Sequence, residues 1–397
     1  MSDTVQFKAV DIIFGEKPQA ALALLDKGAT RAEILEKTGN VLGCAGADLI
    51  VKEGEISVLM GLSGSGKSTL LRGVNGLNKV VRGNILVKHN GKMVDVVTCD
   101  TEMLRQVRQH SVAMVFQQFA LLPWRTVAEN VGLGLELAGM ADGERETRVN
   151  KQLKLVGLDQ WSKKYGHELS GGMQQRVGLA RAFATEAPIL LMDEPFSALD
   201  PLIRTKLQDE LLSLQKTLKK TIIFVSHDLE EALKLGNYIS IMEGGHIVQT
   251  GRPEDIVLRP ANDYVREFIA NVNPLSVLTA YNVMRDARDL EEAGEDWMWL
   301  DRRRTTRFKI GPDRKVVAAE RDKLKATWVA CSEAEKPVAA GERPVFWATP
   351  GTSLRTVMLA MHRADTAPVA LFDESERFVG AIGVRDVLQA VLRRKPD

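Results

Sequence analysis

The chain has few of the features that mark secreted, membrane-spanning or nucleic-acid-binding proteins. Its 397 residues include only three cysteines, which are far apart and form no CxxC pair: Cys44, Cys99 and Cys331. Such sparse cysteine favours a reducing compartment. No apolar run approaches the ~18 residues that span a bilayer, and the N-terminus lacks a signal-peptide pattern. Basic and acidic residues number 53 and 52, so no excess charge predicts a nucleic-acid partner. We therefore expect a cytosolic chain that reaches a membrane only through another protein.

Alternating strand and helix patterns predict an α/β fold. Short apolar runs indicate buried parallel strands at 188–193 and 221–226, and the helical pattern of 202–220 lies between them. Residues 50–60 are also of β type and lead directly into a glycine-rich turn. The stretch of about 120–183 is mostly helical by pattern. It predicts a helical subdomain inserted into the α/β core.

The chain is long enough for two or three domains. Its character changes after about residue 275, where charged blocks and tryptophans appear. We predict a main domain over 1–275, a degenerate linking or regulatory segment over 276–340, and a small α+β domain over 341–397. The last of these has a strand, turn, strand and helix pattern.

The glycine-rich turn has the form GxxxxGK[ST], with a predicted strand before it and a predicted helix after it. Its glycines let backbone N–H groups curl around phosphate oxygens, and the following helix adds its positive end. We expect Lys67 to reach the β- and γ-phosphates of a nucleotide, Ser68 to bind Mg²⁺, and Thr69 to lie at the α-phosphate. The predicted ATP-binding residues of this loop are Gly61, Ser63, Gly64, Gly66, Lys67, Ser68 and Thr69.

Two carboxylates and a histidine follow the other predicted strands. Asp193 ends one strand, at the sheet edge where open α/β sheets bind ligands, and can hold Mg²⁺. Glu194 is adjacent and can polarise a water for attack on the γ-phosphate. His227 follows the neighbouring strand, so its imidazole can contact the γ-phosphate and hold that water. We predict Glu194, His227 and Lys67 as catalytic residues.

These motifs together resemble the ATP-binding subunit of ATP-binding-cassette (ABC) transporters. "LSGGMQQR" (169–176) looks like the signature of that family, "FSALD" (196–200) like its D-loop, and "VFQQFALLPWRTVAENV" like its Q-loop, with Gln117 as the glutamine. The resemblance covers roughly 5–270 and implies an ABC-type ATPase domain with a RecA-like core. It also implies a head-to-tail homodimer, in which each ATP on one phosphate loop is covered by the signature of the partner. The residues that it adds to the ATP site are Gln117, which is also a Mg²⁺ ligand, Ser170, Gly171, Gly172 and Asp200.

A subgroup is indicated by the segment between Phe14 and the phosphate loop. "IFGEKPQAALALLDKG…ILEKTG" has one or two amphipathic helices by pattern and resembles the ATPases of glycine betaine, proline and choline importers. Phe14 matches the aromatic residue that stacks on adenine in the family. Residues 345–394 resemble a CBS motif, although Gly383 replaces the usual Ser or Thr three residues before Asp386, which argues against adenosine-nucleotide binding there.

The resemblance implies a peripheral subunit on the cytoplasmic face of the cell (inner) membrane. Its partners would be transmembrane permease subunits and, indirectly, a periplasmic or lipoprotein substrate-binding protein, with no nucleic acid. Three alternatives remain: an importer ATPase for another small solute, a soluble cassette protein of translation or DNA repair, and a regulatory nucleotide sensor. The complete set of hydrolytic residues argues against the sensor, and the single cassette without a long coiled coil argues against the soluble protein.

The tail carries an acidic block followed by a basic one. The acidic residues are Glu291, Glu292, Glu295 and Asp296, and the basic residues are Arg302, Arg303, Arg304 and Arg307. These runs are either solvated surface or an ionic-strength switch, because salt screens attraction between exposed charges.

Overall fold

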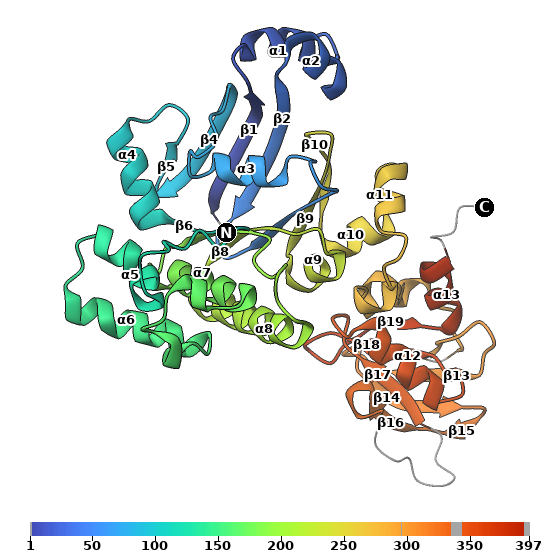
Figure 1. Ribbon diagram of the computed structural model, residues 1–397. Helices are drawn as coiled ribbons and strands as arrows, with labels where there is room; N and C mark the ends of the chain where they lie inside the picture. The colour runs from blue at the N-terminus through green and yellow to red at the C-terminus, as the bar shows by residue number, and fades with distance from the viewer. Residues whose placement is uncertain (1, 295, 335–343, 393–397) are drawn as a thin grey trace. The chain divides into compact units, whose positions relative to one another are not determined.

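The computed structural model describes residues 2–294, 296–334 and 344–392 (Figure 1). The chain divides into two compact units. The first comprises Met1–Ile256 and Ala261–Phe268, and the second Val257–Pro260 and Ile269–Asp397.

A six-stranded sheet forms the core of the first unit, in the order β10-β9-β3-β8-β7-β6. All of its neighbouring strands are parallel except β10 and β9. Every residue of the central strands β3, β7 and β8 is buried, which explains why their sequences are continuous apolar runs rather than alternating ones. The strands are β3 (Ile56–Met60), β6 (Val112–Val115), β7 (Ile189–Asp193), β8 (Thr221–Val225), β9 (Tyr238–Glu243) and β10 (His246–Gly251).

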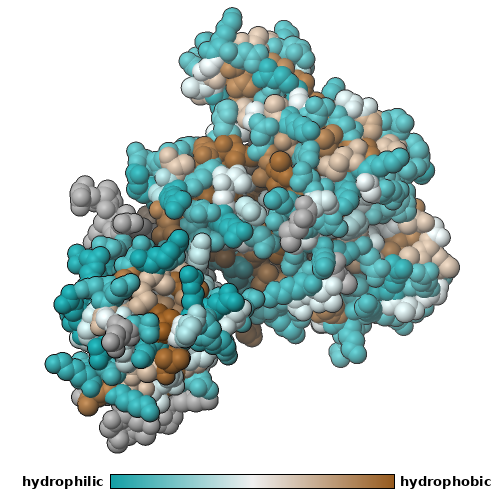
Figure 2. Space-filling view, turned by 180° about the vertical axis from the view of Figure 1, so that it is seen from behind, coloured by the Kyte–Doolittle hydropathy of each residue, from teal (hydrophilic) through white to brown (hydrophobic). Residues whose placement is uncertain are grey.

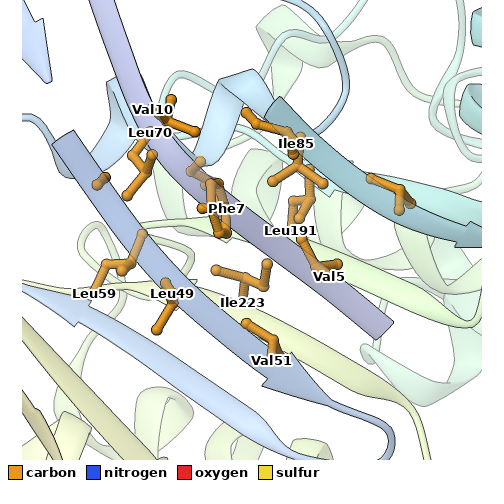
Figure 3. Packing of buried hydrophobic residues seen from close by; sticks show 14 of the residues in the cluster. Val5, Phe7, Val10, Leu49, Val51, Leu59, Leu70, Ile85, Leu191 and Ile223 are labelled. Atoms are coloured by element: carbon orange, nitrogen blue, oxygen red, sulfur yellow. The ribbon is translucent and has the colours of Figure 1, made fainter. Parts of the chain in front are cut away.

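A second, antiparallel sheet of the order β2-β1-β4-β5 packs on this core. Figure 3 shows the contact: Val5 and Phe7 from β1 meet Leu191 and Ile223 of the parallel sheet, and Leu70 lies next to Val10 in the same cluster. The antiparallel strands are β1 (Asp3–Phe14), β2 (Val41–Lys52), β4 (Arg82–His89) and β5 (Lys92–Asp95). Burial of this apolar layer fixes the helix α3 (Lys67–Gly73), which carries Leu70, against both sheets.

Two short helices stand between β1 and β2, at the far end of that strand pair in Figure 1: α1 (Pro18–Leu25) and α2 (Arg31–Thr38). Thr30 and Glu33 form a capping box that starts α2, and Gly39, at φ 67°, ends it. Asn40 joins the two ends of the insertion, because its side chain accepts from Lys17 N and donates to Lys17 O. The sequence pattern predicted one or two helices in this segment, and the structure has two.

The helical subdomain is built from three helices that pack on one another: α5 (Val127–Leu137), α6 (Asp142–Leu155) and α7 (Gly171–Ala184). Thr126 caps α5 in a box with Glu129, and Ser170 caps α7. The remaining helices of this unit are α4 (Thr101–Gln106), α8 (Pro201–Leu218), α9 (Leu229–Leu235) and α11 (Asp263–Phe268), while α10 (Pro253–Leu258) crosses the boundary between the units.

The second unit contains two sheets, of the orders β11-β19-β18-β17-β16 and β12-β13-β14-β15. Its helices are α12 (Leu354–Arg363) and α13 (Val384–Leu392). Its strands are β11 (Arg285–Asp286), β12 (Trp297–Trp299), β13 (Thr306–Ile310), β14 (Val316–Arg321), β15 (Leu324–Lys325), β16 (Thr327–Ala330), β17 (Pro344–Ala348), β18 (Val369–Phe372) and β19 (Phe378–Ile382).

The segment 276–340, expected to be a degenerate linker, forms regular structure in its described part. Its buried Leu300 and Phe308 share a hydrophobic core with Val345, Ala370 and Phe378 of the last segment. One compact unit therefore replaces the predicted linker and separate small domain. The sequence pattern missed this because the strands here are short and their apolar residues few.

The charged blocks of the tail lie on the β12–β13 hairpin and next to it. Arg304 forms an ion pair with Glu291, and both side chains are exposed. Arg307 pairs with Glu320 at 2.6 Å and places its guanidinium over the rings of Trp297 and Trp299, 4.5 and 5.7 Å from their centroids. Glu295, also predicted in the acidic block, lies outside the described residues.

All three cysteines are free, and Cys44 and Cys331 are buried. Desolvation raises the pKa of each of these two thiols to about 12, and it also raises the pKa of the half-buried Cys99. On the face shown in Figure 2, hydrophilic residues predominate and hydrophobic residues are scattered among them in small patches.

Candidate active site

The phosphate loop connects β3 to α3 and depends on glycines at its two ends. Gly61 has φ 142°, and a Cβ there would lie 2.2 Å from the carbonyl oxygen of Met242. Gly66 has φ 102°, and a Cβ would lie 2.3 Å from the carbonyl oxygen of Gly43. A side chain at either position would be both strained and blocked. Among the described residues the buried hydroxyl of Ser65 has no hydrogen-bond partner, so it can donate a hydrogen bond to a phosphate oxygen.

Lys67 lies inside this loop, with only 5% of its surface exposed. Its Nζ donates to the carbonyl oxygens of Gly61 and Leu62, each at 2.9 Å. Burial lowers the pKa of its ammonium group, while the carboxylates of Glu194 and Asp193 act in the opposite direction. A bound phosphate would therefore stabilise the charged form of this ammonium group, which burial disfavours.

Asp193 is fully buried at the C-terminal end of β7. One of its oxygens accepts from Ser68 Oγ at 2.6 Å, and the other accepts from Arg72 Nη2 at 2.8 Å. A hydroxyl and a carboxylate are the hard oxygen donors that Mg²⁺ prefers. Ser68 and Asp193 therefore fit a Mg²⁺ site, and Arg72, one turn further along α3, holds the carboxylate through its other oxygen.

Glu194, Gln117 and His227 meet on one carboxylate oxygen. Gln117 Nε2 donates to Glu194 Oε2 at 3.1 Å, and His227 Nδ1 lies 3.2 Å from the same oxygen. Glu194 has a left-handed backbone, at φ 47°, and its amide donates to the carbonyl oxygen of Val225. Such a conformation costs a non-glycine residue about 1–3 kcal/mol and is typical of functional sites. It turns the side chain out of the strand towards His227.

The signature residues are at a helix start. Ser170 Oγ accepts from Met173 N at the first turn of α7, and Gly171 and Gly172 follow it. Asp200 caps α8 in the same way, through Ile203 N at 3.0 Å. Within the described residues, Ser170 has no hydrogen bond to the phosphate loop of its own chain. The N-terminus of α7 therefore offers backbone N–H groups and the positive end of the helix, which are suited to bind an anion.

Phe14 lies beside the phosphate loop, at the end of β1. A Cβ built on Gly43 would be 2.8 Å from the ring of Phe14 and 2.8 Å from the methyl group of Thr69, so the three positions adjoin. The Phe14 side chain is 42% exposed. A flat apolar face next to the loop, open to solvent, suits stacking against a nucleotide base.

The sequence analysis gave no role to four residues that make contacts at this site. Arg31 of α2 donates to the carbonyl oxygen of Gly64, and Arg72 holds Asp193. Gln175 of α7 is buried and bridges the carbonyl oxygen of Glu194 to Ala198 N, at 3.1 Å each. Glu231 of α9 is buried beside the turn that carries His227. The quoted signature contained Gln175, but nothing in the sequence alone indicated the contacts of the others.

Comparison with known proteins identifies the family. Residues 44–197 match the ABC transporter family, and 341–393 match the CBS domain. The chain is 43% identical, over 99% of its length and 98% of the relative's, to the glycine betaine/proline betaine transport system ATP-binding protein ProV of Salmonella typhimurium. The chain belongs to the ATP-binding subunits of ABC transporters of the quaternary-amine uptake group. The predicted family and fold class are confirmed.

Two further similarities support this family assignment. The glycine betaine transport ATP-binding protein OpuAA of Bacillus subtilis is 41% identical over 98% of this chain and 92% of its own length. A solved dimeric ATP-binding cassette, in a post-hydrolysis state with ADP and Pi, is 30% identical. It covers 63% of this chain and 98% of its own, with a TM-score of 0.54. The chain is thus an ABC-type ATPase that binds ATP, as predicted.

Among the helices of the described residues, none combines the length and the apolar character needed to cross a bilayer. In the CBS-like part, the carboxylate of Asp386 accepts from Gly383 N at 2.7 Å and pairs with Arg285 at 3.0 Å. Both contacts use the same carboxylate oxygen, Oδ2.

Proposed function

We propose that this chain is the ATP-hydrolysing subunit of an importer of small quaternary amines such as glycine betaine, proline betaine or choline. Two copies pair head to tail and act on transmembrane permease subunits at the cytoplasmic face of the membrane, and a substrate-binding protein delivers the amine to the permease. The observation that carries the proposal is the meeting of Glu194, Gln117 and His227 beside the phosphate loop. The nearly full-length similarity to two glycine betaine transport ATPases supports the choice of solute.

In the proposed site, Glu194 is the general base. Its Oε2 is occupied by Gln117 and His227, while Oε1 has no hydrogen bond among the described residues and can take a proton from water. His227 orients that carboxylate and contacts the γ-phosphate. Lys67 neutralises charge on the phosphates, because its ammonium group is already fixed inside the loop. Ser68 and Asp193, with Gln117, would hold Mg²⁺, which supplies charge neutralisation when it is bound.

The remaining residues bind the nucleotide from two chains. Phe14 stacks on adenine, and the loop residues Gly61, Ser63, Gly64, Gly66 and Thr69 surround the phosphates. Ser170, Gly171 and Gly172 of the other copy close the site with the N-terminus of their helix, and Asp200 lies at the same interface.

Solute uptake tests the transport assignment directly. A strain that lacks this chain is supplied with radiolabelled glycine betaine, proline betaine, choline or proline, and uptake is compared with that of the same strain carrying the wild-type chain or Glu194→Gln. We expect the wild-type chain to restore uptake of at least one quaternary amine and Glu194→Gln to restore none. Restoration of none of these solutes by the wild-type chain would contradict the proposal.

A further inference from the structure

A buried carboxylate lies next to the proposed catalytic histidine without being part of the proposed chemistry. Glu231, in the first turn of α9, has 7% of its surface exposed. Burial raises the pKa of its carboxyl group, and hydrogen bonds from Ser226 and Gln208 act against this rise. The adjacent Glu230 is exposed. Because burying a carboxylate is costly unless it binds partners, the contacts of Glu231 indicate what it does.

The two oxygens of Glu231 hold two different segments. Ser226 Oγ donates to Oε2 at 2.5 Å, and the same hydroxyl accepts from Asp228 N at 3.0 Å. His227 is the residue between these two contacts. Gln208 Nε2, from α8, donates to the other oxygen, Oε1, at 3.0 Å. Helix α8 begins immediately after the predicted D-loop, where Asp200 caps it.

We propose that Glu231 is a positioning residue for ATP hydrolysis, which fixes the turn that carries His227 and ties it to α8. Glu231 directs the proton of the Ser226 hydroxyl towards itself, so the oxygen lone pairs remain for Asp228 N, and the peptide of His227 is held on both sides. Through Gln208, the same carboxylate keeps this turn in register with the helix that follows the D-loop. The inference rests on the proposed role of His227.

The chemistry of the side chain explains why a carboxylate is present here. Both groups that point at Glu231 are donors, and a carboxylate accepts on both oxygens. A glutamine has one acceptor and one donor. If its oxygen accepts from Gln208, its amide faces Ser226, whose hydroxyl must then turn its proton away, towards the carbonyl oxygen of Asp228 at 3.3 Å, so the donation from Ser226 to residue 231 is lost. Glu231→Gln therefore changes the hydrogen bonds with almost no change in volume.

The first experiment compares Glu231→Gln with the matched surface variant Glu230→Gln in the full-length chain. We expect Glu231→Gln to lower kcat for ATP hydrolysis by about 10- to 100-fold, the effect of slightly misplacing a reacting group. Its KM for ATP stays within about two-fold of wild type, since the phosphate loop is untouched. Glu230→Gln keeps both constants. Ser226→Ala removes the same hydrogen bond from the other partner and should reproduce the loss of kcat.

A double variant separates positioning from mere stabilisation. If Glu231 acts through His227, then adding Glu231→Gln to His227→Ala causes no further loss in single-turnover hydrolysis. Multiplied losses in the double variant would overturn the proposal, as would an unchanged kcat in Glu231→Gln or a loss that only follows a loss of folded, ATP-binding protein. Normal hydrolysis by His227→Ala alone would instead refute the role proposed for the histidine.

Discussion

Replacing the carboxylate of Glu194 by an amide should separate nucleotide binding from hydrolysis. Glu194→Gln keeps the side-chain volume but cannot take a proton from water, so we expect turnover to fall by about 10²- to 10⁴-fold while ATP binding is preserved. The ATP-bound dimer should then accumulate, which size-exclusion chromatography with ATP would detect. The exposed Glu36→Gln serves as the control. Hydrolysis by Glu194→Gln at close to the wild-type rate would refute the assignment of the base.

Replacing Lys67 should instead weaken binding itself. Lys67→Ala removes a charged donor from the phosphates, and such a bond contributes about 1.5–3 kcal/mol, so the Kd for ATP should rise by roughly 10- to 100-fold. The exposed Lys79→Ala should leave the Kd unchanged. Titration with a fluorescent ATP analogue measures both variants. Unaltered ATP affinity in Lys67→Ala would contradict the prediction that this loop binds the phosphates of ATP through Lys67.

The buried state of Lys67 also predicts a pH dependence. Because burial lowers its pKa in the free protein, a bound polyphosphate restores the charged form and takes up a proton. ATP affinity should therefore be constant below the lowered pKa and decrease as pH rises through it, and Lys67→Ala should lack this decrease. Calorimetric titration at several pH values measures the affinities.

The same lowered pKa affects folding stability. Between the lowered and the ordinary pKa, the unfolded chain binds more protons than the folded chain, so this lysine makes the free energy of unfolding rise with pH in that window.

The sequence predicted the residues that belong to contiguous motifs but not those that reach the site from elsewhere. Glycine spacing after a buried strand locates Lys67 and Ser68, since local geometry determines their place. Arg31 and Glu231 act through contacts with Gly64 and Ser226 that depend on how α2 and α9 pack, and no local pattern encodes these contacts. Their residue types alone are those of ordinary solvated surface.

Among the elements, the start of α7 carries the clearest prediction. Ser170→Arg fills the helix N-terminus that is proposed to bind the nucleotide of the partner, so we expect hydrolysis to be lost while ATP still binds to the phosphate loop. Mixing the Ser170→Arg chain with the Lys67→Ala chain tests whether the signature of one chain completes the phosphate loop of the other. In a mixed dimer one site has both lesions and the other has none, so random pairing should restore roughly a quarter of the wild-type rate. An ATPase rate insensitive to Ser170→Arg would refute the arrangement in trans.

Helices that begin with a clear N-terminal capping residue were predicted better than short strands. The capping box of Thr30 and the cap at Ser170 accompany helices that the pattern indicated, because their N-termini are satisfied locally. The strands of the second unit, such as β12 with three residues, depend on pairing with distant segments. Their formation is decided by the shared core around Phe308, which periodicity cannot reveal.

For the whole molecule, the second unit should control the response to salt. The exposed pair of Arg304 and Glu291 is the kind of contact that dissolved ions screen, over about 8 Å at physiological ionic strength. We expect removal of residues 277–397 to leave ATP hydrolysis intact but to flatten its dependence on salt in the assembled, membrane-embedded transporter. ATPase assays in vesicles across a salt series measure this. The same salt response in the truncated complex would leave the tail as a structural or assembly element.

The cysteine chemistry of the chain makes it a convenient host for optical probes. The thiolate is the form that reacts with maleimide dyes, and the raised pKa values of all three native thiols suppress it at neutral pH. A cysteine introduced at Leu202, which is 79% exposed at the start of α8, would therefore take up dye ahead of the native positions. Energy transfer between donor- and acceptor-labelled copies could then follow the pairing of two cassettes during turnover in the otherwise native chain.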